Sequence, residues 1–352
     1  MSVGITIAVD AMSGDDGPQV VVPAVFAYLE KLQSNDASQA SPAASCQSKA
    51  FNIILVGKQV ELEALLHSYP ENPSISIVHA ETVVSMDDRP SRVLRSKQDS
   101  SMAVALQLVK SGQAQACVSS GNTGALMLLG RSILGTFPGI DRPAITKMFP
   151  SQGGGCFVLD LGANVDSSAE HLLQFAIMGQ VLAKITKGVE NPRVALLNVG
   201  GESIKGNEQV RLAASLIEES EALNYIGFAE GGDIFRSYAD VIVCDGFVGN
   251  VALKSAEGAA KILLSGIKDF FKESWYRKLL GRLMLPLLAK TLKQLDPDTH
   301  NGAIFLGLQG VLVKSHGHAN AKSFEQAIDL AYKEAEANLP ELINSELEKV
   351  LL

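Results

Sequence analysis

The chain has 352 residues, of which 47% are hydrophobic and 19% charged, and its formal net charge at pH 7 is −8. A chain of this length and apolar content can bury a large core, so the composition excludes an intrinsically disordered protein. The acidic balance argues against general nucleic-acid binding, which depends on concentrated Lys and Arg. Because the composition is nearly uniform and no domain linker is visible, we expect one catalytic domain spanning residues 1–352.

The cysteines and the first residues indicate the cellular compartment. Cys46, Cys117, Cys156 and Cys244 are scattered, without the close pair of a zinc knuckle or redox motif, which predicts a reducing environment. The chain runs from Met1 directly into an apolar segment, with neither the basic start nor the long apolar core of a signal peptide. No stretch of membrane-spanning length lacks charges. We therefore expect a cytoplasmic protein.

Short apolar segments, rich in β-branched residues, alternate with longer helical patterns. They predict strands over residues 5–9, 51–56, 75–78, 116–118, 156–159, 194–199 and 241–244. The Ser-, Ala- and Gln-rich segment 34–50 is predicted to be a surface loop. Continuous apolar strands that alternate with helices are typical of βαβ units covered on both faces. We expect an α/β fold, a three-layer α/β/α sandwich with a mostly parallel sheet.

Polar, glycine-containing loops follow these strands. They span residues 10–18, 119–124, 160–164, 200–208 and 245–250. In open α/β sheets the ligand binds at the carboxyl ends of the strands, where glycines allow close backbone approach and Asn and Ser donate hydrogen bonds. Each loop alone also fits ordinary turn and cap chemistry. No loop has the P-loop or the dinucleotide-binding pattern, so the loops together predict a site for a small anion.

These motifs carry a family resemblance. The residues at 8–15, 119–124, 159–164, 205–208 and 245–250 resemble those of the phosphate acyltransferases of bacterial phospholipid synthesis, the PlsX family, and the similarity covers nearly the whole chain. The segment His316–Lys322 extends it, since it resembles a His-Gly-x-Ala-Asp/Asn segment of the family. Two departures stand out: Ser13 replaces a usual second Gly, and the 34–50 segment looks longer than usual.

The resemblance implies an activity, partners and a location. The activity is conversion of a long-chain acyl-[acyl carrier protein] and inorganic phosphate into acyl phosphate, without a cofactor, in a fold akin to isopropylmalate dehydrogenases and phosphate acetyltransferases. A homodimer, loose attachment to the inner face of the cell membrane and a downstream glycerol-phosphate acyltransferase are further expectations. The alternatives are a coenzyme A-dependent phosphate acetyltransferase-like enzyme and a non-catalytic scaffold of lipid synthesis. A decarboxylating dehydrogenase would need a nucleotide site and metal-binding aspartates, which the sequence does not assemble.

The chemistry of acyl transfer to phosphate selects candidate catalytic residues. Attack on a thioester needs a positioned phosphate, a stabilised oxyanion and a thiolate leaving group. Without a Ser-His-Asp or Cys-His signature we favour direct attack, and a covalent acyl-enzyme stays open. Lys205, at a predicted helix start, is the first candidate for holding phosphate or the oxyanion, with a solvated surface lysine as the alternative. Asn250 either donates its amide to the same oxygens or caps a helix.

The remaining candidates have less specific roles. His316 either donates a proton to the departing sulfur or holds a loop. Asp10 and Asp15 orient a lysine or cap helices, whereas Glu208 can tether Lys205. No His, Asp and Glu cluster has metal-ligand spacing, so no metal is expected. The predicted substrate- and phosphate-binding residues are Asp10, Gly14, Asp15, Gly121, Asn122, Asn164, Gly206, Asn207, Glu208, Asp245 and Gly249.

The segment 268–293 differs from the rest of the chain. It has seven basic and two acidic residues, a net +5, and large apolar residues recur every four positions from 275 to 287. The pattern predicts a basic amphipathic hairpin, an excursion over 268–297 that bends near Pro286. It fits an anionic membrane surface, the acidic acyl carrier protein or a dimer interface. The predicted contact residues are Trp275, Arg277, Lys278, Leu279, Arg282 and Leu283.

Overall fold

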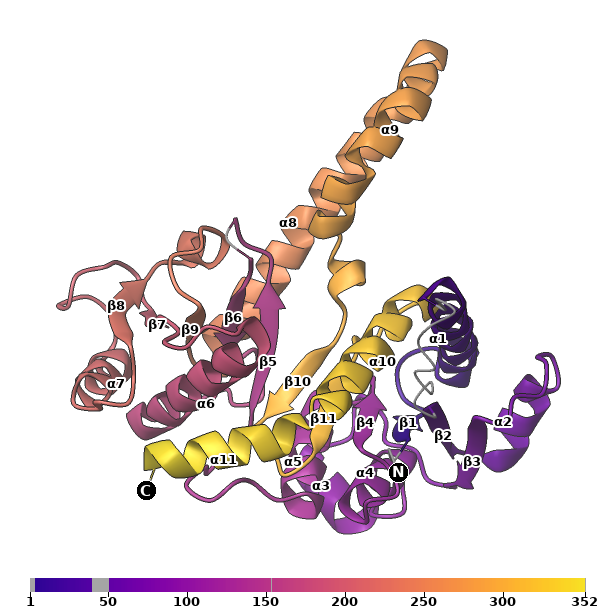
Figure 1. The fold of residues 1–352 in the computed structure, drawn as a ribbon, viewed down its shortest axis with the longest axis horizontal. Helices are drawn as coiled ribbons and strands as arrows, with labels where there is room; N and C mark the ends of the chain where they lie inside the picture. Colours follow the sequence, from indigo (N-terminus) through magenta and orange to yellow (C-terminus); the bar gives the residue numbers. More distant parts are fainter. Residues whose placement is uncertain (1–3, 40–50, 153, 352) are drawn as a thin grey trace. The chain divides into compact units, whose positions relative to one another are not determined.

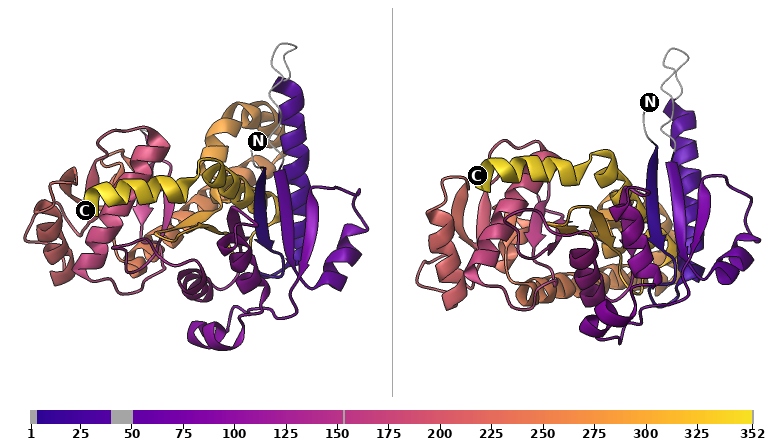
Figure 2. Two further views of the ribbon diagram at one scale, coloured as in Figure 1. Left: turned by 60° about the horizontal axis from the view of Figure 1, so that its bottom comes forward. Right: turned by 90° about the horizontal axis from the view of Figure 1, so that it is seen from below.

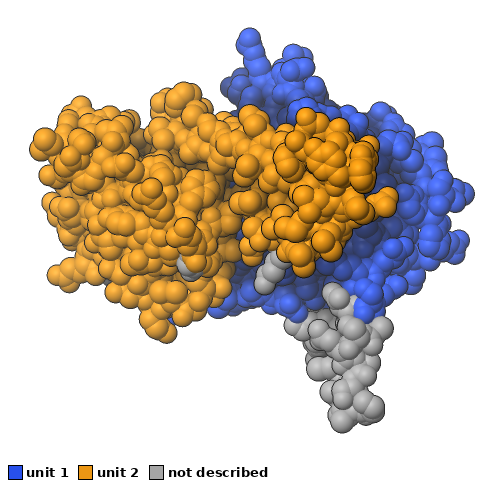
Figure 3. Space-filling model, turned by 90° about the horizontal axis from the view of Figure 1, so that it is seen from above, with its two compact units in different colours: residues 1–145, 301–352 blue, residues 146–300 orange. Residues whose placement is uncertain are grey.

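The computed structural model describes residues 4–39, 51–152 and 154–351, whose helices and strands are drawn in Figure 1 and Figure 2. They divide into two compact units, coloured separately in Figure 3. Unit 1 contains the chain up to Ile145 and from Asn301 onward, and unit 2 contains Thr146–His300. The expectation of one catalytic domain spanning residues 1–352 stays a prediction.

Unit 1 is built on a mostly parallel sheet. Its strands are β1 (Ile5–Asp10), β2 (Phe51–Gly57), β3 (Ile75–His79), β4 (Ala116–Ser119), β10 (Ala303–Leu306) and β11 (Val311–Lys314). Their order is β3-β2-β1-β4-β11-β10, and only the β10–β11 pair is antiparallel. The side chains of Ile7, Leu55 and Val118 are completely buried, which explains why β1, β2 and β4 read as continuous apolar segments.

Helices flank the strands of unit 1. They are α1 (Pro18–Gln39), α2 (Gln59–Leu66), α3 (Pro90–Ser96), α4 (Ser101–Lys110), α5 (Thr123–Ile133), α10 (Ala321–Glu336) and α11 (Leu339–Leu351). Helices α1 and α10 pack together, joined by an ion pair between Lys31 and Glu325, and Figure 2 shows α1 along the strands. The loop prediction for 34–50 is wrong over Ser34–Gln39, which continue α1, and its remainder lies outside the described residues.

Unit 2 contains five further strands, most of them parallel. Its strands are β5 (Ala144–Phe149, beginning at the boundary), β6 (Cys156–Leu159), β7 (Val194–Leu197), β8 (Tyr225–Ala229) and β9 (Val241–Val243). The order is β5-β6-β9-β7-β8, and only β5 is antiparallel to its neighbour β6. The helical segments are α6 (Ala169–Lys187), α7 (Glu208–Glu218), α8 (Gly246–Lys272), α9 (Trp275–Leu295) and the 3₁₀ turns η1 (Gly231–Phe235) and η2 (Pro297–His300).

The predicted fold class is confirmed: the sheet is mostly parallel and helices lie on both of its sides (Figure 1). All seven predicted strands form, although β7 and β9 end one or two residues earlier than expected. Four strands, β5, β8, β10 and β11, were not predicted. Three of them contain Gly, Lys or several half-exposed residues, which breaks the continuous apolar pattern of a buried strand.

Helices α8 and α9 form a long hairpin that extends beyond the strands of unit 2 (Figure 1). The chain reverses at residues 273–274, and α9 continues through Pro286 as one helix. Gly281 allows the close approach of the two helices, because a Cβ atom there would lie 3.1 Å from the Phe271 Cβ. The predicted basic excursion therefore covers the end of α8, α9 and the start of η2. Among the described helices, none is long and apolar enough to cross a membrane.

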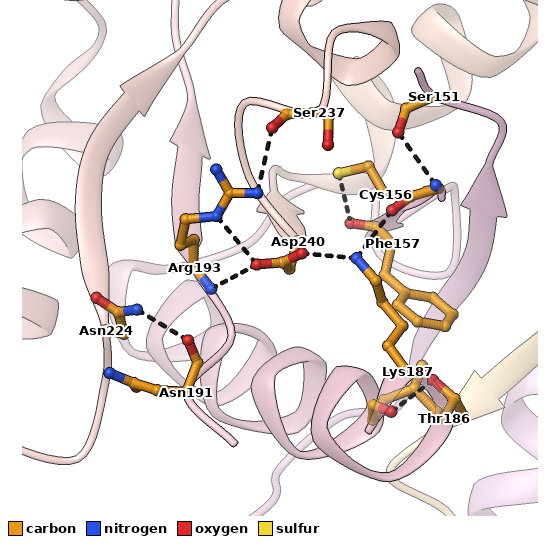
Figure 4. A network of polar contacts seen from close by, with 12 residues as sticks. Ser151, Cys156, Phe157, Thr186, Lys187, Asn191, Arg193, Asn224, Ser237 and Asp240 are labelled. Carbon is orange, nitrogen blue, oxygen red and sulfur yellow. Dashed lines mark hydrogen bonds and ion pairs between the residues drawn. The ribbon is translucent and has the colours of Figure 1, made fainter. Parts of the chain in front are cut away.

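A buried carboxylate joins three elements of unit 2 (Figure 4). Asp240, directly before β9, has a side chain that is only 11% exposed. Its Oδ1 accepts a 2.6 Å hydrogen bond from Lys187 at the end of α6, and its Oδ2 accepts bonds from the backbone N and Nε of Arg193 before β7. Burial by itself would raise the pKa of Asp240, but these hydrogen bonds lower it to about 2.

We predict that Asp240→Asn lowers the free energy of unfolding by about 2–4 kcal/mol at pH 7, because Lys187 keeps a partly buried charge without its counterion. A carboxyl group whose pKa is lowered by folding stabilises above its unfolded pKa of 3.8, and this contribution is lost as the pH falls through about 2. Urea denaturation of the parent and variant should therefore converge between pH 4 and pH 2. The exposed Asp269→Asn is the control, and a pH-independent difference would contradict the assignment.

Candidate functional site

Three loops of unit 2 gather at one edge of its sheet. Strands β6, β9 and β7 are parallel neighbours, so the loops that follow them, 160–168, 244–245 and 198–207, leave from the same edge. These loops and the first turns of α7 and α8 contain eight predicted site residues. They are Asn164, Lys205, Gly206, Asn207, Glu208, Asp245, Gly249 and Asn250.

The loop after β6 is organised by the carboxylate of Asp160, which is completely buried. Its Oδ1 accepts hydrogen bonds from the backbone N–H groups of Gly162 and Ala163, and its Oδ2 accepts bonds from the backbone N and Nδ2 of Asn164. The Asn164 amide nitrogen, predicted to contact phosphate, therefore donates to Asp160 in this structure. The result is a compact loop whose polar atoms are largely satisfied internally.

The first turn of α8 lies directly on this loop because two glycines permit the approach. A Cβ atom on Gly246 would lie 2.3 Å from the Asn164 carbonyl oxygen, and one on Gly249 would lie 1.9 Å from the Asp160 carbonyl oxygen. Real Cβ atoms do not approach backbone this closely, so any other residue at either position would displace the helix. Gly249, predicted as a binding residue, thus has a packing role.

Asn250 is exposed on the first turns of α8 and lies against Gly162. A Cβ atom on Gly162 would be 3.4 Å from the Asn250 Cβ. The alternative that Asn250 caps a helix is wrong, since α8 begins at Gly246 and its N-cap is Asp245, whose Oδ1 accepts from the Val248 N–H. The Asn250 amide remains positioned at the surface of the edge formed by the three loops.

Lys205 lies in the loop between β7 and α7. The predicted helix start is confirmed, because α7 begins at Glu208 after an Asn207 N-cap. The predicted tether is wrong: Lys205 pairs with Glu202 (2.7 Å) and not with Glu208. The hydrogen bond from Lys205 lowers the pKa of Glu202. Gly206 has a φ of +95°, and a Cβ there would lie 2.4 Å from Asn198 Oδ1, so glycine sets the direction of this turn.

A second polar cluster lies in unit 1, at the carboxyl ends of β1 and its parallel neighbour β4. Asp10 is 1% exposed, and its Oδ2 accepts a 2.7 Å hydrogen bond from Ser119 Oγ. Burial raises the pKa of Asp10, an effect that nearby serine hydroxyls partly oppose. Ser13 Oγ donates to the Asp10 carbonyl and accepts from the Ser120 N–H. The serine that departs from the family pattern thus fastens the first loop to the loop after β4.

The loop at Gly14 closes over this cluster. Gly14 has a φ of +86°, and a Cβ there would lie 2.6 Å from Ser120 Oγ. The Asp15 N–H donates to the Gly317 carbonyl, and the Asp15 carboxylate pairs with the exposed His318. Ser13, Gly14, Asp15, Ser120 and Gly317 line a small hollow. Gly121, whose N–H donates to Ser119 Oγ, belongs to the same cluster.

Two other predicted residues of unit 1 have mainly structural contacts. Asn122 caps α5 through the Ala125 N–H, while its Nδ2 donates to the carbonyls of Met86 and Asp88. The backbone N–H of His316 donates to the buried Asn301, which holds the turn after β11. The proposed roles of Asn122 in phosphate binding and of His316 in proton transfer therefore stay predictions.

Several polar residues in these clusters were not predicted from the sequence. Ser119 and Ser120 belong to a loop that was recognised, but serines are common in turns and were not singled out. Lys314 ends β11, next to Ser119 in the sheet register, and its Nζ donates to the Ser120 carbonyl. The strand 311–314 was not predicted, so the rule that ligands bind at strand ends could not be applied to it.

The predicted surface-contact residues lie on α9. Trp275, Leu279 and Leu283 are exposed by 62–78%, and Lys278 and Arg282 are also exposed. Arg277 differs, because its guanidinium pairs with Glu273 and lies 4.5 Å from the Phe270 ring centre. The charge that Arg277 contributes to a partner surface is therefore largely neutralised within the hairpin.

The fold is similar to that of known phosphotransacetylases. A phosphotransacetylase from Streptococcus pyogenes matches with a TM-score of 0.57 and 16% identity over 96% of this chain and 94% of that chain. The EutD phosphotransacetylase from Staphylococcus aureus matches with a TM-score of 0.56 and 14% identity over 95% and 94%. At these identities the likeness concerns the fold alone.

Comparisons of the amino-acid sequence give matches at higher identity. The family model described as "Fatty acid synthesis protein" matches residues 5–342. A phosphate acyltransferase from Marinobacter nauticus is 51% identical over 99% of this chain and 97% of its own, and one from Alcanivorax borkumensis is 50% identical over 97% of both. Such identity over nearly the full length, together with the family match, shows that the chain belongs to the phosphate acyltransferase family.

Proposed function

We propose that the chain transfers a long-chain fatty acyl group from the thioester of acyl carrier protein to inorganic phosphate and so supplies acyl phosphate for phospholipid synthesis. The near-full-length identity to phosphate acyltransferases carries this proposal, because it fixes phosphate as the acceptor class. The family description as a fatty acid synthesis protein supports a fatty acyl group as the cargo.

The proposed reaction is direct attack of a phosphate oxygen on the thioester carbonyl. A new C–O bond forms, the carbonyl oxygen becomes a transient oxyanion, and the C–S bond then breaks to release the thiolate of the carrier. Lys205 holds the anionic phosphate by charge, and the Asn250 amide donates a hydrogen bond to the developing oxyanion. Lys205 follows β7, and Asn250 lies on the first turns of α8, which follows β9. Since β7 and β9 are parallel neighbours, both residues lie at the same sheet edge, which supports this division of roles.

A covalent route through cysteine finds little support among the described residues. Cys117, Cys156 and Cys244 are buried, and burial raises the pKa of each thiol, that of Cys156 to about 12. A thiol with a raised pKa is a poor nucleophile near neutral pH, since the thiolate is the reactive form. Phosphate itself is already anionic, so direct attack needs no activated side chain.

The acyl donor distinguishes this proposal from the alternative of a coenzyme A-dependent phosphate acetyltransferase. The similar structures are phosphotransacetylases, which favours the alternative, but that likeness concerns the fold. Acetyl-coenzyme A and a long-chain acyl carrier thioester should therefore be offered to the purified chain in parallel. Equal or greater turnover of acetyl-coenzyme A would replace the proposed donor.

We predict that the purified chain forms acyl phosphate from long-chain acyl carrier protein and phosphate, detected by mass spectrometry. Asn250→Ala should lower turnover by at least about 100-fold, since removal of one oxyanion donor has an effect of that size. Lys205→Ala should lower it by a similar factor, because the attacking phosphate loses the charge that positions it. The exposed Lys261→Ala on α8 is the matched control and should keep the parent rate. Folded variants with near-normal rates would remove Lys205 and Asn250 from the catalytic site.

We further propose that α9 attaches the chain to the inner face of the cell membrane, where the apolar product can pass to a downstream glycerol-phosphate acyltransferase. Exposed Trp275, Leu279 and Leu283 recur every four residues on α9, beside the exposed Lys278 and Arg282. An amphipathic helix with this composition suits insertion into an anionic lipid surface. Docking of acyl carrier protein and homodimer packing are the competing roles of the same surface.

We predict that Leu279→Glu weakens binding to vesicles containing anionic phospholipid by at least about tenfold, because it removes an inserted apolar group and adds repulsion. Vesicle sedimentation measures this, and added salt should weaken binding of the parent. Leu342→Glu on α11, also an exposed leucine, is the control. Unchanged vesicle binding would exclude the membrane role, and loss of a dimer together with binding would assign the surface to subunit packing.

A further inference from the structure

Large apolar side chains are exposed around the polar edge of unit 2. Val199 and Ile204, in the loop that holds Lys205, are 79% and 83% exposed. Val165, directly after the Asp160–Asn164 loop, is 65% exposed, and Phe247 on the first turn of α8 is 62% exposed. Loop residues at a sheet edge are usually polar, so exposed apolar side chains on two loops and on the adjoining start of α8 indicate an apolar ligand.

The parallel strands place these side chains together. The loops after β6, β9 and β7 leave the sheet from one edge. The exposed apolar residues that follow these strands therefore lie at the same edge as Lys205 and Asn250. Phe247 and Val251 are four residues apart on α8, and Asn250 is three residues after Phe247, so these side chains share one helix face. We call Val165, Val199, Ile204, Phe247 and Val251 the apolar collar.

Core packing does not account for the collar. Val251 is 50% exposed, and the other four members are exposed by 62–83%. In the same loops the apolar side chains of Leu161 and Cys244 are buried, so these loops do supply residues to the core. The collar residues are the apolar side chains that the core leaves exposed, and they lie at the sheet edge that holds Lys205 and Asn250.

We propose that the apolar collar binds the alkyl chain of the acyl donor next to the thioester carbonyl. This inference rests on the proposed function, because the carbonyl held by Asn250 is bonded directly to the first methylenes of the chain. A surface continuous with the carbonyl site must contact those methylenes, and transfer of one methylene from water into an apolar site is worth about fourfold in affinity. The collar thereby makes the enzyme selective for long acyl chains.

The test compares donors that differ only in chain length. Acetyl and palmitoyl thioesters of the same carrier protein are offered to the parent and to Ile204→Asn/Phe247→Asn. We expect kcat/KM for the palmitoyl donor to fall by at least about tenfold, mainly through KM, while that for the acetyl donor, which has no methylene to bind, changes less than about threefold. Val60→Asn, an equally exposed valine on α2, is the matched control. Equal changes for both donors, or none, would overturn the proposal.

A binding measurement separates this inference from the proposed function. The fluorescent fatty acid cis-parinaric acid should bind the parent and Val60→Asn, and bind the double variant at least about fivefold more weakly. Absence of turnover in the parent with every thioester would refute the proposed function, while parinaric acid still reports on the collar. Circular dichroism checks folding, and Ile204→Ala/Phe247→Leu replaces the double variant if that variant unfolds. A change in oligomeric state with unaltered chain-length selectivity would reassign the collar to an interface between copies.

Discussion

The contact between the first turn of α8 and the Asp160–Asn164 loop sets the geometry of unit 2. A carboxylate without exposed surface fastens the loop through four hydrogen bonds, and two glycines one helical turn apart let the helix rest on the loop backbone. The fastened loop alone is not sufficient for this contact, because a side chain at Gly249 would collide with the Asp160 carbonyl. Asn250 and the apolar residues of α8 occupy their positions as a consequence of this contact.

The acidic and amide residues of the strand-end loops serve mainly as structural acceptors. Asp245, Asn207 and Asn122 cap α8, α7 and α5, and Asp160 fills its own loop. Carboxylates at these helix starts offset the positive end of the helix dipole. Because the caps occupy backbone N–H groups at these helix starts, a cation such as Lys205 is better able to bind an anionic substrate than those N–H groups are. The polar loops thus combine a rigid frame with a small number of exposed functional groups.

The sequence predicted much of the fold because the buried parallel strands read as continuous apolar segments, such as 5–9 and 156–159. Strand β11 was missed, since four residues ending in Lys314 look like part of a loop, and Lys314 was missed with it. The motifs located Lys205 and Asn250, but spacing alone could not separate Asp245, the true N-cap of α8, from Asn250. Side-chain pairing, such as that of Lys205 with Glu202, depends on the path of a loop that local patterns do not determine.

Unit 1 is interrupted in the sequence by the whole of unit 2, and this has a consequence for synthesis on the ribosome. Strand β4 pairs on one side with β1 and on the other with β11, which is translated only after unit 2 is complete. Until then one edge of β4 lacks its partner, and Asp10 and Ser119 lack the neighbouring turn at Lys314. An unpaired buried strand invites aggregation, and closing so long a loop slows folding. Completion of unit 1 therefore waits for β11, and until then the open edge of β4 is the part of unit 1 most exposed to aggregation.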